Sequence, residues 1–125
     1  MNYQQKYRAY YYKNSQTGKV PALEYIERLS KKEKVKVLKY VDFLKENKGY
    51  LDEPYAKHIK DKIRELRIDF SKNKHRIFYF TFIGKRIILL HIFLKKTEKT
   101  PKQEIIKALD NLHDCELNKT FIKYE

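Results

Sequence analysis

Three strand-like runs follow one another in the second half of the chain, and they limit the possible folds more than any other feature. The runs cover residues 63–70, 75–83 and 85–94. The breaks between them, at residues 71–74 and around Gly84, are short enough for hairpins, which join antiparallel neighbours. We therefore expect a small antiparallel sheet built from consecutive strands.

The first half of the chain predicts one strand and two helices. Aromatic residues favour a strand over residues 6–12, and Pro21 predicts the start of a helix. The apolar face of this helix comprises Ala22, Tyr25, Ile26 and Leu29. Ser30 and Glu33 have the spacing of a capping box and begin a second helix, which ends at residues 47–49. Its apolar stripe comprises Val37, Leu38, Val41 and Leu44.

A last helix is expected from Pro101, with Thr100 as its cap. Its apolar stripe comprises Ile105, Ile106, Leu109 and Leu112. The predicted order is therefore β-α-α-β-β-β-α, an α+β fold in which helices cover a small antiparallel sheet. No repeat and no Gly/Ser-rich linker divides the chain, so we expect residues 1–125 to form a single domain.

The charge of the chain indicates the kind of partner that it binds. It has 29 Lys and Arg against 16 Asp and Glu, a formal net charge of +13 spread from Lys6 to Lys123. Such a charge attracts nucleic acid or an acidic protein. The longest apolar run, residues 87–93, is too short to cross a membrane, and the N-terminal residues lack the apolar stretch of a secretory signal. We therefore expect a cytoplasmic protein that is not bound to a membrane.

Several chemistries have no matching residue pattern. The chain has no Gly-rich phosphate loop, no His-Glu-x-x-His and no Ser flanked by glycines as in a nucleophile elbow. Cys115, the single cysteine, has no Cys or His at the spacing of a zinc site, and we interpret it as a small buried hydrophobic residue. We expect neither a metal nor an organic cofactor.

Basic side chains recur on the predicted strands, which is unusual for a sheet that forms only a core. They are Arg64, Arg67, Arg76, Arg86, Lys95 and Lys96. Because residues two apart share a face, Glu65, Arg67 and Asp69 can project together toward a concave surface, with the basic residues 57–62 as a loop at its rim. Such a surface would hold phosphates. Tyr79, three residues after Arg76, falls on the opposite face and is expected in the core.

RNA cleavage through the ribose 2′-hydroxyl suits such a surface. It needs activation of that oxygen, stabilisation of the charge on phosphorus, and a proton for the 5′-oxygen that leaves. Arg can stabilise the charge, and Lys can transfer a proton if like-charged neighbours lower its pKa. His58, His75 at a hairpin edge, and His91 are alternative acids or bases, although a lone strand histidine is more often structural.

Three motifs, in order, resemble the HigB-like, phage-related branch of the RelE/ParE toxin superfamily. They are Lys57 followed by Glu65-Leu66-Arg67, then His75-Arg76-Ile77-Phe78-Tyr79, and then residues 91–101 followed by Ala108. Upstream, residues 21–26 are similar to the start of a helix in that family, so the likeness covers nearly the whole chain. Lys62 and His75 depart from the pattern, because a glycine and an aromatic residue are common at these positions.

The resemblance implies a RelE-like fold and a ribosome-dependent mRNA endonuclease that leaves a 2′,3′-cyclic phosphate without a metal. It implies catalytic roles for Arg67, Arg76, Lys57 and Lys60. It implies RNA contacts for Lys95 and Lys96. From the basic and histidine side chains of the predicted strands and loop, we also expect RNA-binding roles for Lys62, Arg64 and His91. It also implies a cognate antitoxin, typically a helix-turn-helix repressor that covers the basic site, and a higher-order toxin–antitoxin complex on operator DNA.

Two alternatives stay open. The first is a ParE-like toxin, which inhibits DNA gyrase by protein contact and cleaves no nucleic acid. The second is a basic RNA-binding or ribosome-binding module, since charge and aromatic side chains alone explain non-specific binding. Toxicity without mRNA cleavage favours the first alternative, and binding without growth arrest favours the second.

Overall fold

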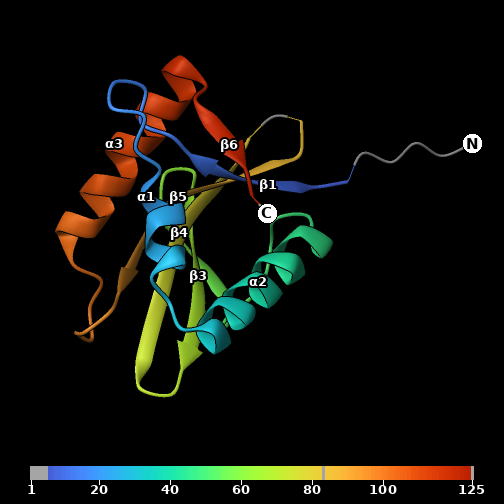
Figure 1. Ribbon diagram of the computed structural model, residues 1–125, viewed down its shortest axis with the longest axis vertical. Coiled ribbons are helices and arrows are strands. Elements are labelled where there is room, and N and C mark those ends of the chain that lie inside the picture. Colours follow the sequence, from blue (N-terminus) through green and yellow to red (C-terminus); the bar gives the residue numbers. More distant parts are fainter. Residues whose placement is uncertain (1–5, 83, 125) are drawn as a thin grey trace, which may run out of the picture.

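The computed structural model describes residues 6–82 and 84–124, through which one mixed sheet runs (Figure 1). The elements are, in chain order, β1 (Arg8–Tyr12), α1 (Pro21–Glu27), α2 (Lys31–Glu46), β2 (Ala56–Lys60), β3 (Ile63–Phe70), β4 (Asn73–Phe82), β5 (Arg86–Leu94), α3 (Lys102–Asn118) and β6 (Phe121–Lys123). The strands lie in the order β2-β3-β4-β5-β1-β6. None of the helices in these residues is long and apolar enough to cross a membrane. Ile83, the end of a predicted strand, lies outside the described residues.

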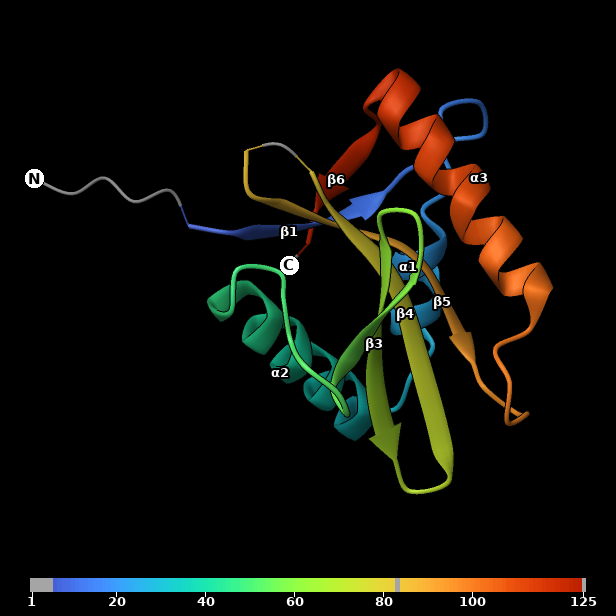
Figure 2. The same cartoon turned by 180° about the vertical axis from the view of Figure 1, so that it is seen from behind.

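The predicted antiparallel strands form the centre of the sheet. β3 pairs antiparallel with β4, and β4 pairs antiparallel with β5. Arg67 of β3 lies opposite Arg76 of β4, which in turn lies opposite Phe93 of β5. The β3–β4 hairpin projects at one end of the molecule, away from β1 and β6 (Figure 2). The prediction of two consecutive hairpins is confirmed.

The sheet as a whole is mixed, which corrects the expectation of an antiparallel sheet. β1 pairs parallel with β5, with Ala9 opposite Ile87. Parallel neighbours need a connection of a dozen or more residues, and here α1, α2 and the intervening strands supply it. Because β2 covers the free edge of β3, the first strand pairs instead with the open edge of β5. No local pattern near β1 encodes that choice.

Two further strands correct the predicted element order. β2 (Ala56–Lys60) occupies part of the segment that we expected to be a basic loop, and it pairs antiparallel with β3. β6 (Phe121–Lys123) pairs antiparallel with β1 near the end of the chain. Both are edge strands whose side chains, apart from buried Ala56, are exposed or half-buried, so their sequences lack the apolar alternation of a buried strand.

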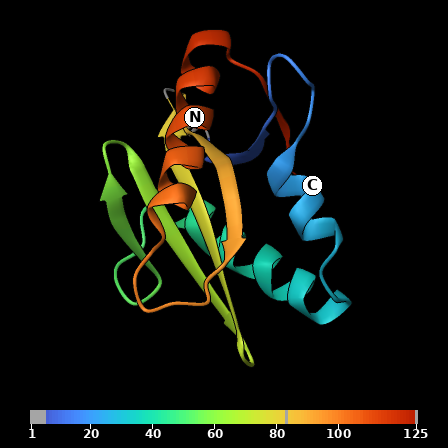
Figure 3. The same cartoon turned by 90° about the vertical axis from the view of Figure 1, so that its left-hand side faces the viewer.

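Each face of the sheet has its own hydrophobic core. On one face, α1 and α2 contribute Ala22, Ile26, Val37, Val41 and Leu44, which cluster with Leu66, Ile68, Ile77 and Tyr79. On the other face, α3 contributes Ala108, Leu112 and Cys115, which cluster with Ile63, Phe78, Phe80 and Phe93. Figure 3 shows α3 and the pair α1–α2 on opposite sides of the sheet. The predictions that Tyr79 and Cys115 are buried are confirmed.

The helix signals are confirmed in part. The Ser30 side chain accepts a hydrogen bond from the Glu33 backbone N–H, as the capping box predicts. Thr100 is not the cap of α3, because Pro101 occupies the N-cap position and no side chain caps it. Ile106 is 55% exposed, which corrects its place in the buried stripe. It follows Ile105 by one residue, or about 100° around the helix, and Ala108 takes the inward position instead.

Candidate functional site

Four cations surround one buried carboxylate on the α3 side of the sheet. Glu65 lies opposite Lys57 of β2 and opposite Phe78 of β4, whose ring belongs to the α3 core. Arg67 shares this face because it is two residues further along β3. Arg76 and Lys95 complete the group, which we call the cationic cluster: Lys57, Glu65, Arg67, Arg76 and Lys95. The charges of the other four members all act on the ammonium of Lys95.

Glu65 is the centre of this cluster and is fully buried. Arg67 donates through Nε to Glu65 Oε1 at 3.1 Å. Among the described residues, no group forms a hydrogen bond with Glu65 Oε2. A buried carboxylate is costly unless cations compensate its charge, so the surrounding Lys and Arg side chains make its burial possible.

Arg76 is only 6% exposed and is held from two sides. It donates through Nη1 to Asp69 Oδ1 at 2.8 Å and to the His75 carbonyl at 3.0 Å. Its buried Nε has no hydrogen-bond partner among the described residues. A guanidinium held this way keeps a donor available for an oxygen of a bound anion.

Lys95 lies at the end of β5, and its backbone N–H donates to the Lys74 carbonyl at 2.8 Å. Burial lowers the pKa of its ammonium, and the nearby Arg76, Arg67 and Lys57 lower it further, whereas Glu65 opposes them. A lysine with a lowered pKa is neutral in a larger fraction of molecules and can accept a proton. The cluster therefore combines fixed positive charge with one potential base.

His91 lies on the same face of β5 and is joined to α3. Its Nε2 is 2.6 Å from Glu104 Oε1, and its ring stacks at 5.9 Å on Phe93. Burial lowers the pKa of His91, while the hydrogen bond with Glu104 acts in the opposite direction. These two contacts hold the His91 ring between β5 and α3. In the sheet, Phe78 lies between His91 and Glu65.

A basic groove continues from Lys95 toward the tip of the β3–β4 hairpin. It has a volume of about 450 Å³. Lys72, Lys74, Lys95 and Lys96 line it together with Asn73 and Glu98. Lys96 thus lies next to the cluster but outside it, on a surface suited to a chain of phosphates.

Three of the predicted site residues lie elsewhere. Arg64 is on the α2 face, where it donates to the Tyr79 hydroxyl and the Leu51 carbonyl and stacks on Tyr50. Lys62 pairs with Glu116 near the end of α3 at 2.5 Å. Lys60 is exposed and lies opposite Ile63, past a shift in the β2–β3 register. Among the described residues, none of these three forms a hydrogen bond or ion pair with a member of the cluster.

The other two histidines have separate environments. His58 is exposed, with Nε2 2.7 Å from the Asp61 carbonyl. His75, which we expected at a hairpin edge, is 3% exposed on the α1–α2 face. Its Nδ1 is 2.7 Å from the Tyr25 hydroxyl, and its Nε2 is 2.7 Å from Glu33 Oε2. These contacts make His75 a link between the helices and β4.

The sequence analysis gave no role in the site to three acidic residues. Strand alternation did place Glu65 and Asp69 on the face of Arg67, but neither was predicted to be a site residue. Nothing in the local sequence marked Glu104, because its partner His91 is 13 residues away. Among residues 6–82 and 84–124, no three His, Cys, Asp or Glu side chains are grouped as they would be to bind a metal.

One comparison with known proteins matches most of the chain. The family model described as "Phage derived protein Gp49-like" matches residues 24–113. A search of the curated proteins finds no match. The matched residues include the whole cationic cluster as well as His91 and Glu104.

Proposed function

Because the chain belongs to the Gp49-like family, a phage-derived family of toxins from toxin–antitoxin systems, we propose that it is an endonuclease that cleaves mRNA on the ribosome. The cationic cluster is the observation that carries this proposal. Four Lys and Arg side chains lie around Glu65 on one face of the sheet, and a basic groove leads away from them. This arrangement fits the phosphodiester backbone of RNA.

The roles follow from what each side chain offers. Arg67 and Arg76 stabilise the negative charge that develops on the phosphate oxygens in the transition state. The Nε of Arg76, which has no partner among the described residues, donates to one of these oxygens. Glu65 holds Arg67 in place through the bond to its Nε.

The proton transfers fall to the lysines. Lys95, whose pKa is lowered by burial and by its cationic neighbours, accepts the proton of the 2′-hydroxyl. The 2′-oxygen then attacks phosphorus, and the bond from phosphorus to the 5′-oxygen breaks. Lys57, opposite Glu65, gives its proton to the departing oxygen. The products are a 2′,3′-cyclic phosphate and a 5′-hydroxyl, and no metal takes part in these steps.

The ribosome and the antitoxin complete the proposal. The Lys95-Lys96 motif resembles the position at which related toxins keep basic residues that touch RNA in the decoding site. A toxin of this family has an antitoxin partner. A helix-turn-helix antitoxin that also holds the complex on operator DNA is part of the proposal, as is the cytoplasmic location.

The experiment is to induce the protein in a bacterial host and map the 5′ ends of mRNA over the following minutes, with and without a block on translation initiation. We expect new 5′-hydroxyl ends within translated frames, and we expect them to disappear when ribosomes are kept off the message. Growth arrest with intact mRNA would instead favour gyrase inhibition. If neither growth arrest nor mRNA cleavage occurs, the alternative of a basic RNA-binding module is favoured.

A further inference from the structure

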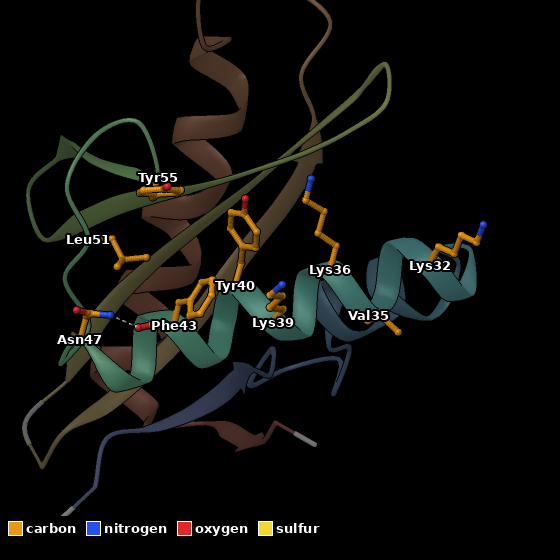
Figure 4. Close-up of a pocket in the computed structure, with 9 residues that line it drawn as sticks. All are labelled: Lys32, Val35, Lys36, Lys39, Tyr40, Phe43, Asn47, Leu51 and Tyr55. Carbon is orange, nitrogen blue, oxygen red and sulfur yellow. Dashed lines mark hydrogen bonds between the residues drawn. The ribbon is translucent and has the colours of Figure 1, made fainter.

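A second surface, on the opposite side of the sheet from the cationic cluster, has the properties of a docking site. A hollow of about 600 Å³ lies between the outer face of α2 and the segment that leads into β2. We call it the α2 groove. Figure 4 shows Tyr40 pointing from the helix toward Tyr55, with Phe43 and Leu51 at the end near Asn47.

The α2 groove gathers exposed apolar side chains. Val35 is 58% exposed, Phe43 41% and Tyr55 49%, and all three line the groove. The Tyr40 ring lies 6.0 Å from the Phe43 ring and 6.3 Å from the Tyr55 ring, so three aromatic rings form a continuous wall. Exposed apolar surface that is grouped in one hollow marks an interaction site, whereas single exposed residues do not.

Lysines flank this apolar surface along the helix. Lys32, Lys36 and Lys39 have the i, i+4, i+7 spacing that places them in one row. Lys36 is partly engaged, since its Nζ donates to the Asp69 carbonyl and lies 5.8 Å from the Tyr40 ring centre. Among the described residues that line the groove there is no carboxylate. The matching partner therefore carries an apolar stripe beside a row of acidic residues.

We propose that the α2 groove docks an acidic amphipathic helix of the antitoxin. The inference rests on the proposed function, because it takes the toxin–antitoxin pair as given and adds the surface where the pair meets. From Lys32 to Asn47 the groove follows α2 for about 22 Å, which four turns of a partner helix would cover. The partner's carboxylates, spaced like the lysines, would face Lys32 and Lys39.

A second copy of this chain fits the groove less well. A two-fold dimer through α2 would place the lysine row of one copy against the same row of the other. The chain already carries a net charge of +13, and like charges across an interface oppose association. An acidic helix removes this repulsion in the same step that buries the apolar wall.

An antitoxin helix docked in the α2 groove does not cover the cationic cluster. The groove lies on the face of Leu66 and Ile68, whereas Glu65 and Arg67 point to the α3 side. A variant that loses the docking contact should therefore keep its nuclease activity. Such a variant separates neutralisation from catalysis.

The test uses the full chain and the protein encoded by the adjacent gene as the antitoxin probe. Phe43→Glu places a negative charge in the apolar wall, and Leu117→Glu makes the same kind of change at an 82% exposed site on α3. We expect Phe43→Glu to weaken antitoxin binding by about 10-fold or more, as loss of an aromatic anchor does, and Leu117→Glu to change it less than about twofold. Phe43→Glu should also arrest growth in cells that contain enough antitoxin to protect the wild type.

A charge-reversal pair tests the lysine row. Lys39→Glu should slow association with the antitoxin, whereas Lys19→Glu, at an exposed position outside the groove, should not. Amide hydrogen exchange of the wild-type complex should show protection over residues 35–47.

Each contrary outcome has a separate meaning. If the antitoxin neutralises the wild type and Phe43→Glu equally well, the docking site is wrong and the toxin function stands. If the chain alone forms a dimer and Phe43→Glu dissociates it, the groove serves self-association and the inference is overturned. If the wild type is not toxic and no adjacent protein binds it, the proposed function fails and the inference fails with it.

Discussion

Arg67 and Arg76 lie directly opposite each other on β3 and β4, yet each guanidinium is paired with a different carboxylate. Arg67 pairs with buried Glu65 at 3.1 Å, and Arg76 pairs with Asp69 at 2.8 Å. Like charges directly opposite on a sheet repel, so both acidic partners are needed to hold the two arginines side by side. A phosphate bound between them would supply further compensation.

Replacement of Arg76 by Ala should abolish most of the nuclease activity. Loss of one contact to the transition state costs about 2 to 4 kcal/mol, or roughly 10²- to 10³-fold in rate. The rate of mRNA cleavage on purified ribosomes measures this loss, with circular dichroism to show that the fold is retained. Arg86→Ala is the matched control, because Arg86 is exposed at the other end of β5. An Arg76→Ala protein with wild-type cleavage would exclude the proposed role.

Glu65→Gln should shift the pH dependence of cleavage to lower pH. Glu65 raises the pKa of Lys95 against burial and the neighbouring cations. Without that negative charge the Lys95 pKa falls further, so the neutral amine that accepts the 2′-hydroxyl proton is present at lower pH. The rising limb of the pH–rate profile on purified ribosomes measures the shift.

The control for that profile is Asp69→Asn, since Asp69 is not among the charges that set the Lys95 pKa. Its rising limb should stay near that of the wild type. If the rising limb of the pH–rate profile of Glu65→Gln stays in place or moves to higher pH, Lys95 is not the base.

Glu33→Gln should reduce stability at neutral pH and remove part of the acid sensitivity of folding. Hydrogen bonds from His75, Asn73 and Ser30 hold the pKa of Glu33 below its usual range. A lowered pKa in the folded state contributes stability that is present above the unfolded pKa, about 4.3, and is lost as the pH falls through the folded value. Charged hydrogen bonds of this kind contribute about 1 to 3 kcal/mol.

Urea unfolding at about one-unit intervals between roughly pH 3 and pH 7 measures the free energy of unfolding of the wild type and of Glu33→Gln. Glu24→Gln serves as the control, because its pair with Arg28 is long, at 3.9 Å, and exposed. It should change stability by less than about 0.5 kcal/mol. Equal effects of the two substitutions at pH 7 would contradict the structural role of the Glu33–His75 link.

Gly49→Ala should destabilise the protein more than Gly18→Ala, although both glycines have positive φ. A Cβ at Gly49 would lie 2.6 Å from Thr81 Oγ1, whereas at Gly18 the nearest atom, in Lys13, is 3.8 Å away. The left-handed backbone alone costs about 1 to 2 kcal/mol at either site. The clash at Gly49 adds about 1 to 3 kcal/mol. Thermal unfolding of the two variants gives the difference, and equal melting temperatures would refute the close approach of Gly49 to β4.

Much of the site could be predicted because strand alternation is a local property. The period of two residues along β3 places Glu65, Arg67 and Asp69 on one face, and the same rule places Arg64 on the other. The hairpins then set Arg76 beside Arg67 and bring β5 next to β4. The functional roles of these residues remain predictions that the experiments above test.

What the sequence by itself determined was the set of local elements: the central antiparallel strands, the helices with their apolar stripes, and the basic residues on one strand face. Only the tertiary structure decided that β1 runs parallel to β5, that β2 and β6 extend the sheet, and that Glu104 meets His91. The physical reason is that helix and strand periods are properties of neighbouring residues, whereas edge pairing depends on which strand edge is open once the chain has closed its hairpins.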